Sequence, residues 1–211
     1  MSWNIVLGPP GTGKTTFLLN TVKELFDKGI QPHELAYLAF TKKAATEALT
    51  RAIDKFTYEE DQLIYFRTIH SLCYFWQGLT RSDILDRKDL RTFSKLVGER
   101  INSAWDGENL MALNSVGDNM LFLENMARNT CKTYRDSWNT AKSDITWIHF
   151  DWFCNSYNNF KQINFLMDYT DMLSGFMDLE TRPILKALIV DEAQDLSALQ
   201  WKCIHKLAQG V

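Results

Sequence analysis

The sequence predicts an α/β protein, in which a parallel β-sheet flanked by helices is interrupted by an all-α insertion. Short apolar runs alternate with stretches of helical periodicity near both ends of the chain, a pattern typical of β-α-β units. The region between them, 78–163, has helical spacing and no run that indicates a buried strand. A glycine-rich turn, Gly8–Thr15, lies where the first predicted strand meets the first predicted helix.

The first α/β segment, 1–77, begins with a short apolar run over Asn4–Leu7 that ends in a Gly/Pro cluster, as a buried strand should. Apolar residues at helical spacing then predict a helix over Gly13–Lys28, with Gly29 as its stop. Further elements are expected as a strand over Leu35–Thr41, a helix over Lys43–Phe56 and a strand over Leu63–Thr68.

The insertion, 78–163, carries two apolar stripes that predict core-facing helices. The stripes are Leu90, Phe93, Val97, Ile101 and Trp105, then Trp152, Phe153, Tyr157, Phe160 and Ile163. The α/β pattern returns over 164–211 with a helix from Asp168, a strand over Ala187–Val190 and a helix near Ser197–Leu207. We therefore predict one α/β domain, 1–77 and 164–211, split by a helical subdomain.

Composition and charge restrict the function only weakly. The 211 residues have a net charge of −3, so any DNA contact must use a local patch of Lys and Arg rather than a basic surface overall. The four cysteines form no C-x-x-C pair, which favours reduced, mostly packed thiols over a zinc site. Without a signal sequence or an apolar run of about 18 residues, the sequence predicts a cytoplasmic protein with no membrane segment.

The turn matches the complete phosphate-binding pattern G-x-x-x-x-G-K-[ST]. Its glycines allow backbone N–H groups to face phosphate oxygens, and the following helix adds partial positive charge. Lys14 is expected to reach the β- and γ-phosphates of ATP, and the Thr15 hydroxyl to bind Mg²⁺. The predicted nucleotide-binding residues are Gly8, Pro9, Pro10, Gly11, Thr12, Gly13, Lys14 and Thr15.

A pair of acids, Asp191 and Glu192, follows the predicted strand Ala187–Val190. Asp191 is expected to hold Mg²⁺ through water, as a strand-end Asp does in P-loop enzymes. Glu192 is placed to polarise an attacking water, which favours hydrolysis over transfer to a small acceptor. Lys14, Asp191 and Glu192 are the predicted catalytic residues, and Thr15 and Asp191 the predicted metal ligands.

In five segments the sequence resembles superfamily 1 helicases of the UvrD/Rep branch. They are the motif I loop Gly8–Thr15, Phe40–Ala45 (similar to FTNKAA), Thr68–Ser71 (similar to T-F-H-S), Asp168–Leu173 (similar to D-F-x-D-L-L) and Val190–Asp195 (similar to VDExQD). The resemblance implies a first RecA-like ATP-binding domain with a 1B-like helical insertion. It also implies ATP-driven 3′→5′ translocation on single-stranded DNA, and unwinding.

The same resemblance assigns residues to DNA and nucleotide. It implies DNA contacts by Phe40, Thr41, Lys42, Thr68 and His70, and nucleotide contacts by Thr16 and Gln194. Three of the DNA-contact residues have structural alternatives: Phe40 as core, Lys42 as a solvated helix start and His70 as a hydrogen-bonded structural residue. Gln194 could belong to a plain turn, and Asp168 could cap its helix.

Three departures from the family pattern shape the expected activity. First, seven residues precede Gly8, so the upstream motif that reads adenine in the family is lacking. Second, Thr16 stands where the family often has an Arg that contacts the base. Third, the chain stops at Val211, where motif III would begin. We expect a monomer that binds ATP and Mg²⁺, turns ATP over slowly and does not unwind DNA alone. A second RecA-like domain, in the parent chain or a partner, would supply arginine fingers worth on the order of 10³–10⁵ in rate.

Two other classes remain open. A nucleotide or metabolite kinase would need an arginine lid, and the insertion offers Arg81, Arg87, Arg91, Arg100, Arg128 and Arg135. A nucleotide-binding module for DNA or protein partners could use the aromatic stripes as a surface, although such stripes are usually core. Phosphate transfer to a small acceptor, or nucleotide binding without hydrolysis, would distinguish these classes.

Overall fold

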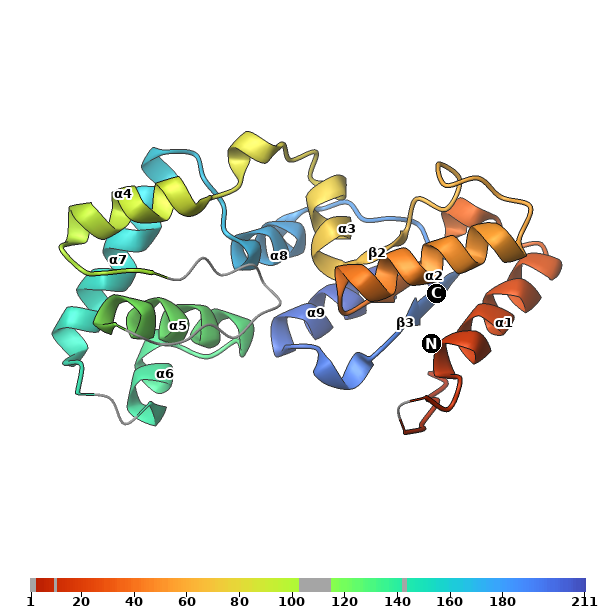
Figure 1. The fold of residues 1–211 in the computed structure, drawn as a ribbon, viewed down its shortest axis with the longest axis horizontal. Helices are drawn as coiled ribbons and strands as arrows, with labels where there is room; N and C mark the ends of the chain where they lie inside the picture. Colours follow the sequence, from red (N-terminus) through yellow and green to blue (C-terminus); the bar gives the residue numbers. More distant parts are fainter. Residues whose placement is uncertain (1–2, 10, 103–114, 142–143) are drawn as a thin grey trace. The chain divides into compact units, whose positions relative to one another are not determined.

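The computed structural model describes residues 3–9, 11–102, 115–141 and 144–211. The chain divides into two compact units, one α/β and one helical (Figure 1). The α/β unit is Met1–Trp76, Met177–Leu196 and Gln200–Val211, and the helical unit is Gln77–Phe176 and Ser197–Leu199. The predicted class, a parallel sheet flanked by helices with a helical insertion, is confirmed. The helical unit runs on to Phe176, and the assignment of 78–163 as a subdomain stays a prediction.

The sheet has three parallel strands in the order β2-β1-β3. They are β1 (Leu35–Ala39), β2 (Phe66–Thr68) and β3 (Ala187–Val190). All five residues of β1 are buried, because a central parallel strand is covered on both faces and therefore reads as a continuous apolar run. Tyr37 pairs in register with Phe66 on one side and Ile189 on the other.

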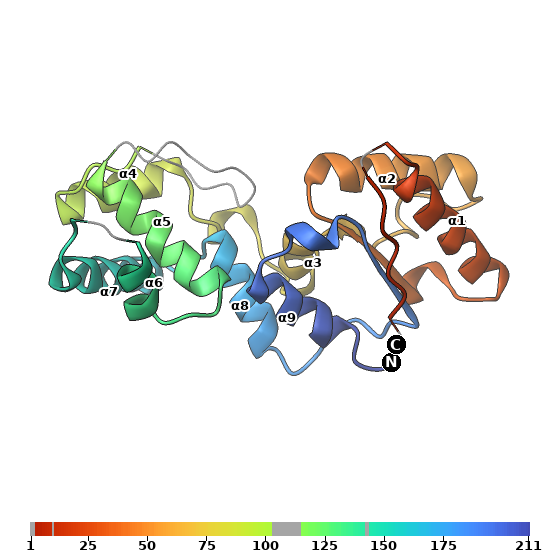
Figure 2. The same ribbon diagram turned by 90° about the horizontal axis from the view of Figure 1, so that it is seen from below.

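Helices cover both faces of the sheet, with α1 and α2 on one side and α3 and α9 on the other (Figure 2). Their bounds are α1 (Lys14–Asp27), α2 (Lys42–Lys55), α3 (Ile69–Trp76) and α9 (Ala198–Leu207), and the short turns η1 (Pro32–Glu34) and η3 (Ala193–Asp195) lie between elements. The hydroxyl of Thr41 begins α2 by accepting a hydrogen bond from Ala44 N at 3.1 Å. The core between the sheet and helices α1 and α2 includes Leu19, Val22, Tyr37, Ala45, Ala48, Ala52, Phe66 and Ile189.

The predicted first strand, Asn4–Leu7, is wrong. The segment lies outside the sheet, and Ile5 and Leu7 are 80% and 89% exposed. A short apolar run meets the side-chain requirement of a buried strand, but it does not supply the neighbouring strand to which the backbone must hydrogen-bond. Near this segment, the ring of Trp3 packs edge-on against Trp201 in α9, with ring centroids 6.3 Å apart.

The helical unit contains the turn η2 (Arg81–Asp83), helices α4 (Arg87–Val97), α5 (Val116–Asn129), α6 (Tyr134–Thr140) and α7 (Trp147–Ile163), and all but the last two residues of α8 (Tyr169–Asp178). The two predicted stripes meet here, since the ring of Phe93 lies 5.4 Å from Phe153 and 5.2 Å from Tyr157. Two stripe members are not core, because Trp152 and Ile163 are 46% and 76% exposed. Trp105 lies outside the described residues.

Two further expectations concern the thiols and the membrane. All four cysteines are free; Cys73, Cys154 and Cys203 are buried, and Cys131 is exposed. This confirms the expectation of mostly packed thiols. Across the described parts of the chain, no helix combines the length and the apolar character that crossing a bilayer requires.

Candidate nucleotide-binding site

The glycine-rich loop runs directly into α1, as predicted. Gly11 and Gly13 have φ angles of 79° and 84°, the left-handed region that favours glycine. A Cβ atom at either position would meet nothing within 4 Å, so the backbone conformation rather than crowding requires glycine there. Gly8 differs, because its Cβ would lie 2.7 Å from Thr12 Oγ1. Pro10, also predicted to bind nucleotide, lies outside the described residues.

Side chains of the loop hydrogen-bond to its own carbonyl groups. Lys14 Nζ donates to Gly8 O at 2.9 Å and to Pro9 O at 3.4 Å, and Thr12 Oγ1 donates to Pro9 O at 2.8 Å. Thr15 and Thr16 follow in the first turn of α1, where N–H groups have no partner within the helix. That turn has no acidic residue and no side-chain cap, so it keeps the partial positive charge that suits a phosphate.

Asp191 is fixed at the end of β3 by three hydrogen bonds. Its N–H donates to Leu38 O at 2.8 Å, which extends the β1–β3 pairing by one residue. Its Oδ2 accepts from the Tyr37 hydroxyl at 2.9 Å, and its Oδ1 accepts from Glu192 N at 3.0 Å. Burial, and then the charge of Asp191, raise the pKa of Tyr37 above its usual range, so the phenol stays a donor.

Glu192 begins a tight turn with φ of 51°, an uncommon conformation for a residue with a side chain. The turn closes through a hydrogen bond from Asp195 N to Glu192 O at 3.0 Å. Gln194 Nε2 donates to Glu192 Oε2 at 2.5 Å and lies 3.4 Å from Asp195 Oδ2. The predicted nucleotide residue Gln194 therefore holds the side chain of the predicted base.

The loop before α1 and the turn after β3 lie toward the same end of the sheet in both views (Figures 1 and 2). The Thr15 hydroxyl and the Asp191 carboxylate offer oxygen ligands, which Mg²⁺ prefers. In the described ranges no group of three or more His, Cys, Asp or Glu side chains could hold a metal by itself. A cation here would take its other ligands from phosphate and water, which is the usual way Mg²⁺ is bound. The residues present therefore fit a magnesium nucleotide.

The predicted DNA-contacting residues gather where β1 and β2 end, since Ala39 pairs in register with Thr68. Thr41 caps α2, and the buried Thr68 Oγ1 accepts a hydrogen bond from Ser71 N at 3.1 Å. Phe40 and His70 are half-buried, and Lys42 is exposed. The two threonines thus have structural tasks, and the DNA contacts of all five residues stay predictions.

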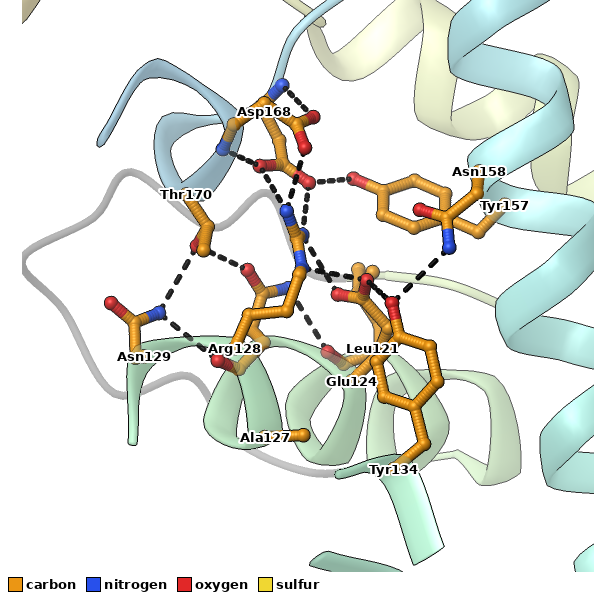
Figure 3. Close-up of polar contacts among 12 residues, drawn as sticks. Leu121, Glu124, Ala127, Arg128, Asn129, Tyr134, Tyr157, Asn158, Asp168 and Thr170 are labelled. Carbon is orange, nitrogen blue, oxygen red and sulfur yellow. Dashed lines mark hydrogen bonds and ion pairs between the residues drawn. The ribbon is translucent and has the colours of Figure 1, made fainter. Parts of the chain in front are cut away.

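The D-x-x-D segment caps α8, as the structural alternative proposed. Asp171 N donates to Asp168 Oδ1 at 2.8 Å, and Asp168 N donates to Asp171 Oδ2 at 3.0 Å. The same carboxylates also bind two cations from other helices, and Figure 3 shows one of them, Arg128. Arg128 of α5 and Lys161 of α7 reach Asp168 Oδ2 at 2.5 and 2.8 Å, and Tyr157 donates to the same oxygen at 3.1 Å.

Three carboxylates of the helical unit, Glu124, Asp168 and Asp171, share the two cations Arg128 and Lys161. Glu124, fully buried, accepts from Arg128 NH2 at 2.8 Å; Arg128 Nε lies as close to the other Glu124 oxygen, without the alignment of a hydrogen bond. Burial alone would raise the pKa of Asp168, but the charges of Arg128 and Lys161 outweigh it and hold that pKa well below its usual range. Burial raises the pKa of Glu124.

The UvrD/REP helicase N-terminal domain family matches residues 2–211, which covers both the α/β unit and the helical unit. The chain belongs to this family. The match thus joins the phosphate loop, the Asp191–Glu192 pair and the helical unit in one family domain.

Three relatives indicate where this domain occurs. A "Probable DNA helicase" of Mycoplasma pneumoniae is 28% identical over 97% of this chain and 41% of its own length. "ATP-dependent DNA helicase PcrA" of Staphylococcus epidermidis is 34% identical over 33% of this chain and 10% of its own length. "Probable DNA helicase II homolog" of M. pneumoniae is 40% identical over the same shares. The chain therefore matches less than half of the length of each of these relatives.

Two features of the structure were not predicted. Tyr37 read as an ordinary core residue of an apolar strand, although a buried phenol needs a hydrogen-bond partner and could have signalled a polar group nearby. The partners of Asp168 lie on separate helices, and no local pattern links Arg128 or Lys161 to it. Arg128 was noted only as one arginine of a hypothetical lid.

Proposed function

We propose that the chain is the ATP-binding and ATP-hydrolysing part of a superfamily 1 DNA helicase. One observation carries the proposal: a complete phosphate loop opening α1 and an acid pair ending β3 occur together in a chain that matches the helicase family over residues 2–211. The loop offers N–H groups and Lys14 to phosphate, and Asp191 offers a fixed carboxylate to a cation.

The proposed roles follow from these positions. Lys14 Nζ exchanges its contacts with Gly8 O and Pro9 O for the negatively charged β- and γ-phosphates, which are stronger acceptors. The Thr15 hydroxyl would bind Mg²⁺, and the Asp191 carboxylate would hold it through water. When bound, this ion neutralises charge on the phosphates. Glu192, oriented by Gln194, accepts a proton from the attacking water.

The wider activity is proposed from the family. The relatives are named as DNA helicases, and we propose single-stranded DNA as the partner at the ends of β1 and β2. Arginines from a second RecA-like domain would complete the cleft. Under this proposal the 211-residue chain acts as a monomer in the cytoplasm, binds ATP and turns it over slowly.

The test is ATP hydrolysis by the purified 211-residue chain, with and without single-stranded DNA. Equilibrium binding of ATP is measured alongside. We expect Lys14→Ala to weaken ATP binding about 10–100-fold, the size expected for a lost charged hydrogen bond. Glu192→Gln should keep binding but lose the slow turnover, and Glu24→Gln, on the exposed surface of α1, serves as the matched control.

Three results would contradict the proposal. Phosphate transfer to a nucleoside monophosphate or another small acceptor would indicate a kinase instead. Turnover unaffected by Glu192→Gln would remove the assigned base. An absence of ATP binding would overturn the nucleotide site altogether.

A further inference from the structure

Tyr37 is the polar residue of the central strand β1, and its side chain is completely buried. Its ring stacks on that of its register partner Phe66, with centroids 5.4 Å apart and planes 11° from parallel. This packing fixes the ring, and therefore also the position of its hydroxyl group. The hydroxyl donates to Asp191 Oδ2 at 2.9 Å across 154 residues of sequence.

The hydrogen bonds to Asp191 leave it oriented but not saturated. Among the described residues, each carboxylate oxygen has one donor: Oδ2 has the Tyr37 hydroxyl and Oδ1 has Glu192 N. A carboxylate oxygen can accept two hydrogen bonds, so each oxygen keeps a lone pair. A carboxylate with one donor on each oxygen cannot rotate freely, and the direction of those lone pairs is therefore fixed.

We propose that Tyr37 is a positioning residue for the magnesium ion: its hydroxyl holds the Asp191 carboxylate so that the remaining lone pairs accept from water on the ion. The inference rests on the proposed function. It assigns a residue outside the phosphate loop and the Asp-Glu pair to the same site. A purely structural tyrosine would only satisfy a buried carboxylate, and its loss would lower stability without changing magnesium dependence.

The experiment titrates Mg²⁺ into the 211-residue chain with a fluorescent ATP analogue and follows analogue binding. For Tyr37→Phe, which keeps the stacked ring, we expect the half-maximal Mg²⁺ concentration to rise about tenfold, as is usual when a group orienting a metal ligand is lost. Analogue binding in EDTA should stay within about twofold of wild type, because the loop itself is unchanged. Tyr157→Phe is the matched control, since it removes a buried hydroxyl from Asp168 instead.

A second variant keeps the test decisive if Tyr37→Phe folds poorly. Replacing Tyr37 with 4-aminophenylalanine restores a donor at the ring tip, and wild-type magnesium dependence is expected. Magnesium dependence unchanged in a folded Tyr37→Phe, or weakened equally by the amino variant, would overturn the role of Tyr37 alone. Failure of wild type to bind the analogue with Mg²⁺ would instead overturn the proposed function, and this inference with it.

Discussion

Two buried aspartates, one in each unit, accept hydrogen bonds from buried tyrosines but differ in the charged groups around them. Tyr157 donates to Asp168 at 3.1 Å, and Tyr37 donates to Asp191 at 2.9 Å. Asp168 also contacts the cations of Arg128 and Lys161, whereas no salt bridge joins Asp191 to a cation in the described part of the chain. The charge of Asp168 is paired with cations of the protein itself, whereas Asp191 is the carboxylate that we propose as a ligand of Mg²⁺.

The comparison separates two reasons for burying a carboxylate. A buried charge is costly unless it is paired, so the cluster around Asp168 should be sensitive to the loss of any one partner. Asp191 has only neutral donors, and its buried charge would be paired by the Mg²⁺ ion of the proposed site. Stability should therefore depend strongly on the first aspartate and weakly on the second.

The largest effect is expected from Arg128→Met. The substitution leaves Glu124, Asp168 and Asp171 without their shared cation, and removing one partner of a buried ion pair typically costs about 3–5 kcal/mol. Urea unfolding followed by circular dichroism measures the loss. Arg87→Met, at an exposed position of α4, should change the unfolding free energy by under about 0.5 kcal/mol. An equally small loss of unfolding free energy for Arg128→Met would contradict the expected difference between the surroundings of Asp168 and Asp191.

A medium effect, dependent on pH, is expected from Asp168→Asn. The folded-state pKa of Asp168 lies below its ordinary value of 3.8, so its charge stabilises the fold above pH 3.8 and this contribution is lost as pH falls further. The variant should be less stable than wild type by about 2 kcal/mol at pH 7, with the difference shrinking below pH 3.8.

Urea unfolding of both proteins between pH 7 and pH 2.5 makes this measurement. Tyr157→Phe provides a control that removes a neutral partner from the same carboxylate. Its cost should vary less with pH than that of Asp168→Asn. A difference between wild type and Asp168→Asn that grew toward low pH would contradict the sign of the shift.

The smallest change in stability is expected from Asp191→Asn without ligand. The side-chain oxygen of Asn can still accept one hydrogen bond, and no cation is left unpaired, so the unfolding free energy should change by under about 1 kcal/mol. The difference between wild type and Asp191→Asn should be larger when nucleotide and Mg²⁺ are added at saturating concentration. A ligand at 100 times its Kd stabilises a protein by about 2.7 kcal/mol. Thermal melts should show this gain in wild type and little of it in the variant; equal gains would contradict the role of Asp191.

The elements that could be predicted are those specified by local pattern. The strand Ala187–Val190 was predicted with its observed bounds, and α1 and α2 were predicted to within one residue, because helical periodicity and the stop at Gly29 act over a few residues. The strand predicted at Asn4–Leu7 failed because pairing depends on a partner far away in the sequence. Helix α8 was predicted, but its place in the helical unit was not, since that depends on contacts with α5 and α7.

The candidate site divides in the same way. The phosphate loop and the acid pair are contiguous in sequence, so their chemistry could be recognised without a structure. The hydroxyl that orients Asp191 lies 154 residues away on another strand, and Arg128 lies 40 residues from Asp168. Such partners are set by the order of strands and by helix packing, which no local spacing encodes.

The sheet order has a consequence for how the chain emerges from the ribosome. The central strand β1 is complete at Ala39, but its neighbour β3 begins only at Ala187. At translation rates of about 5–20 residues per second, β3 is synthesised about 7–30 s after β1. During this time one edge of β1 has no strand partner, and an uncovered strand edge can pair with other chains. The helical unit is synthesised in this interval. Its early folding would make the long connection between β1 and β3 compact before β3 pairs with β1.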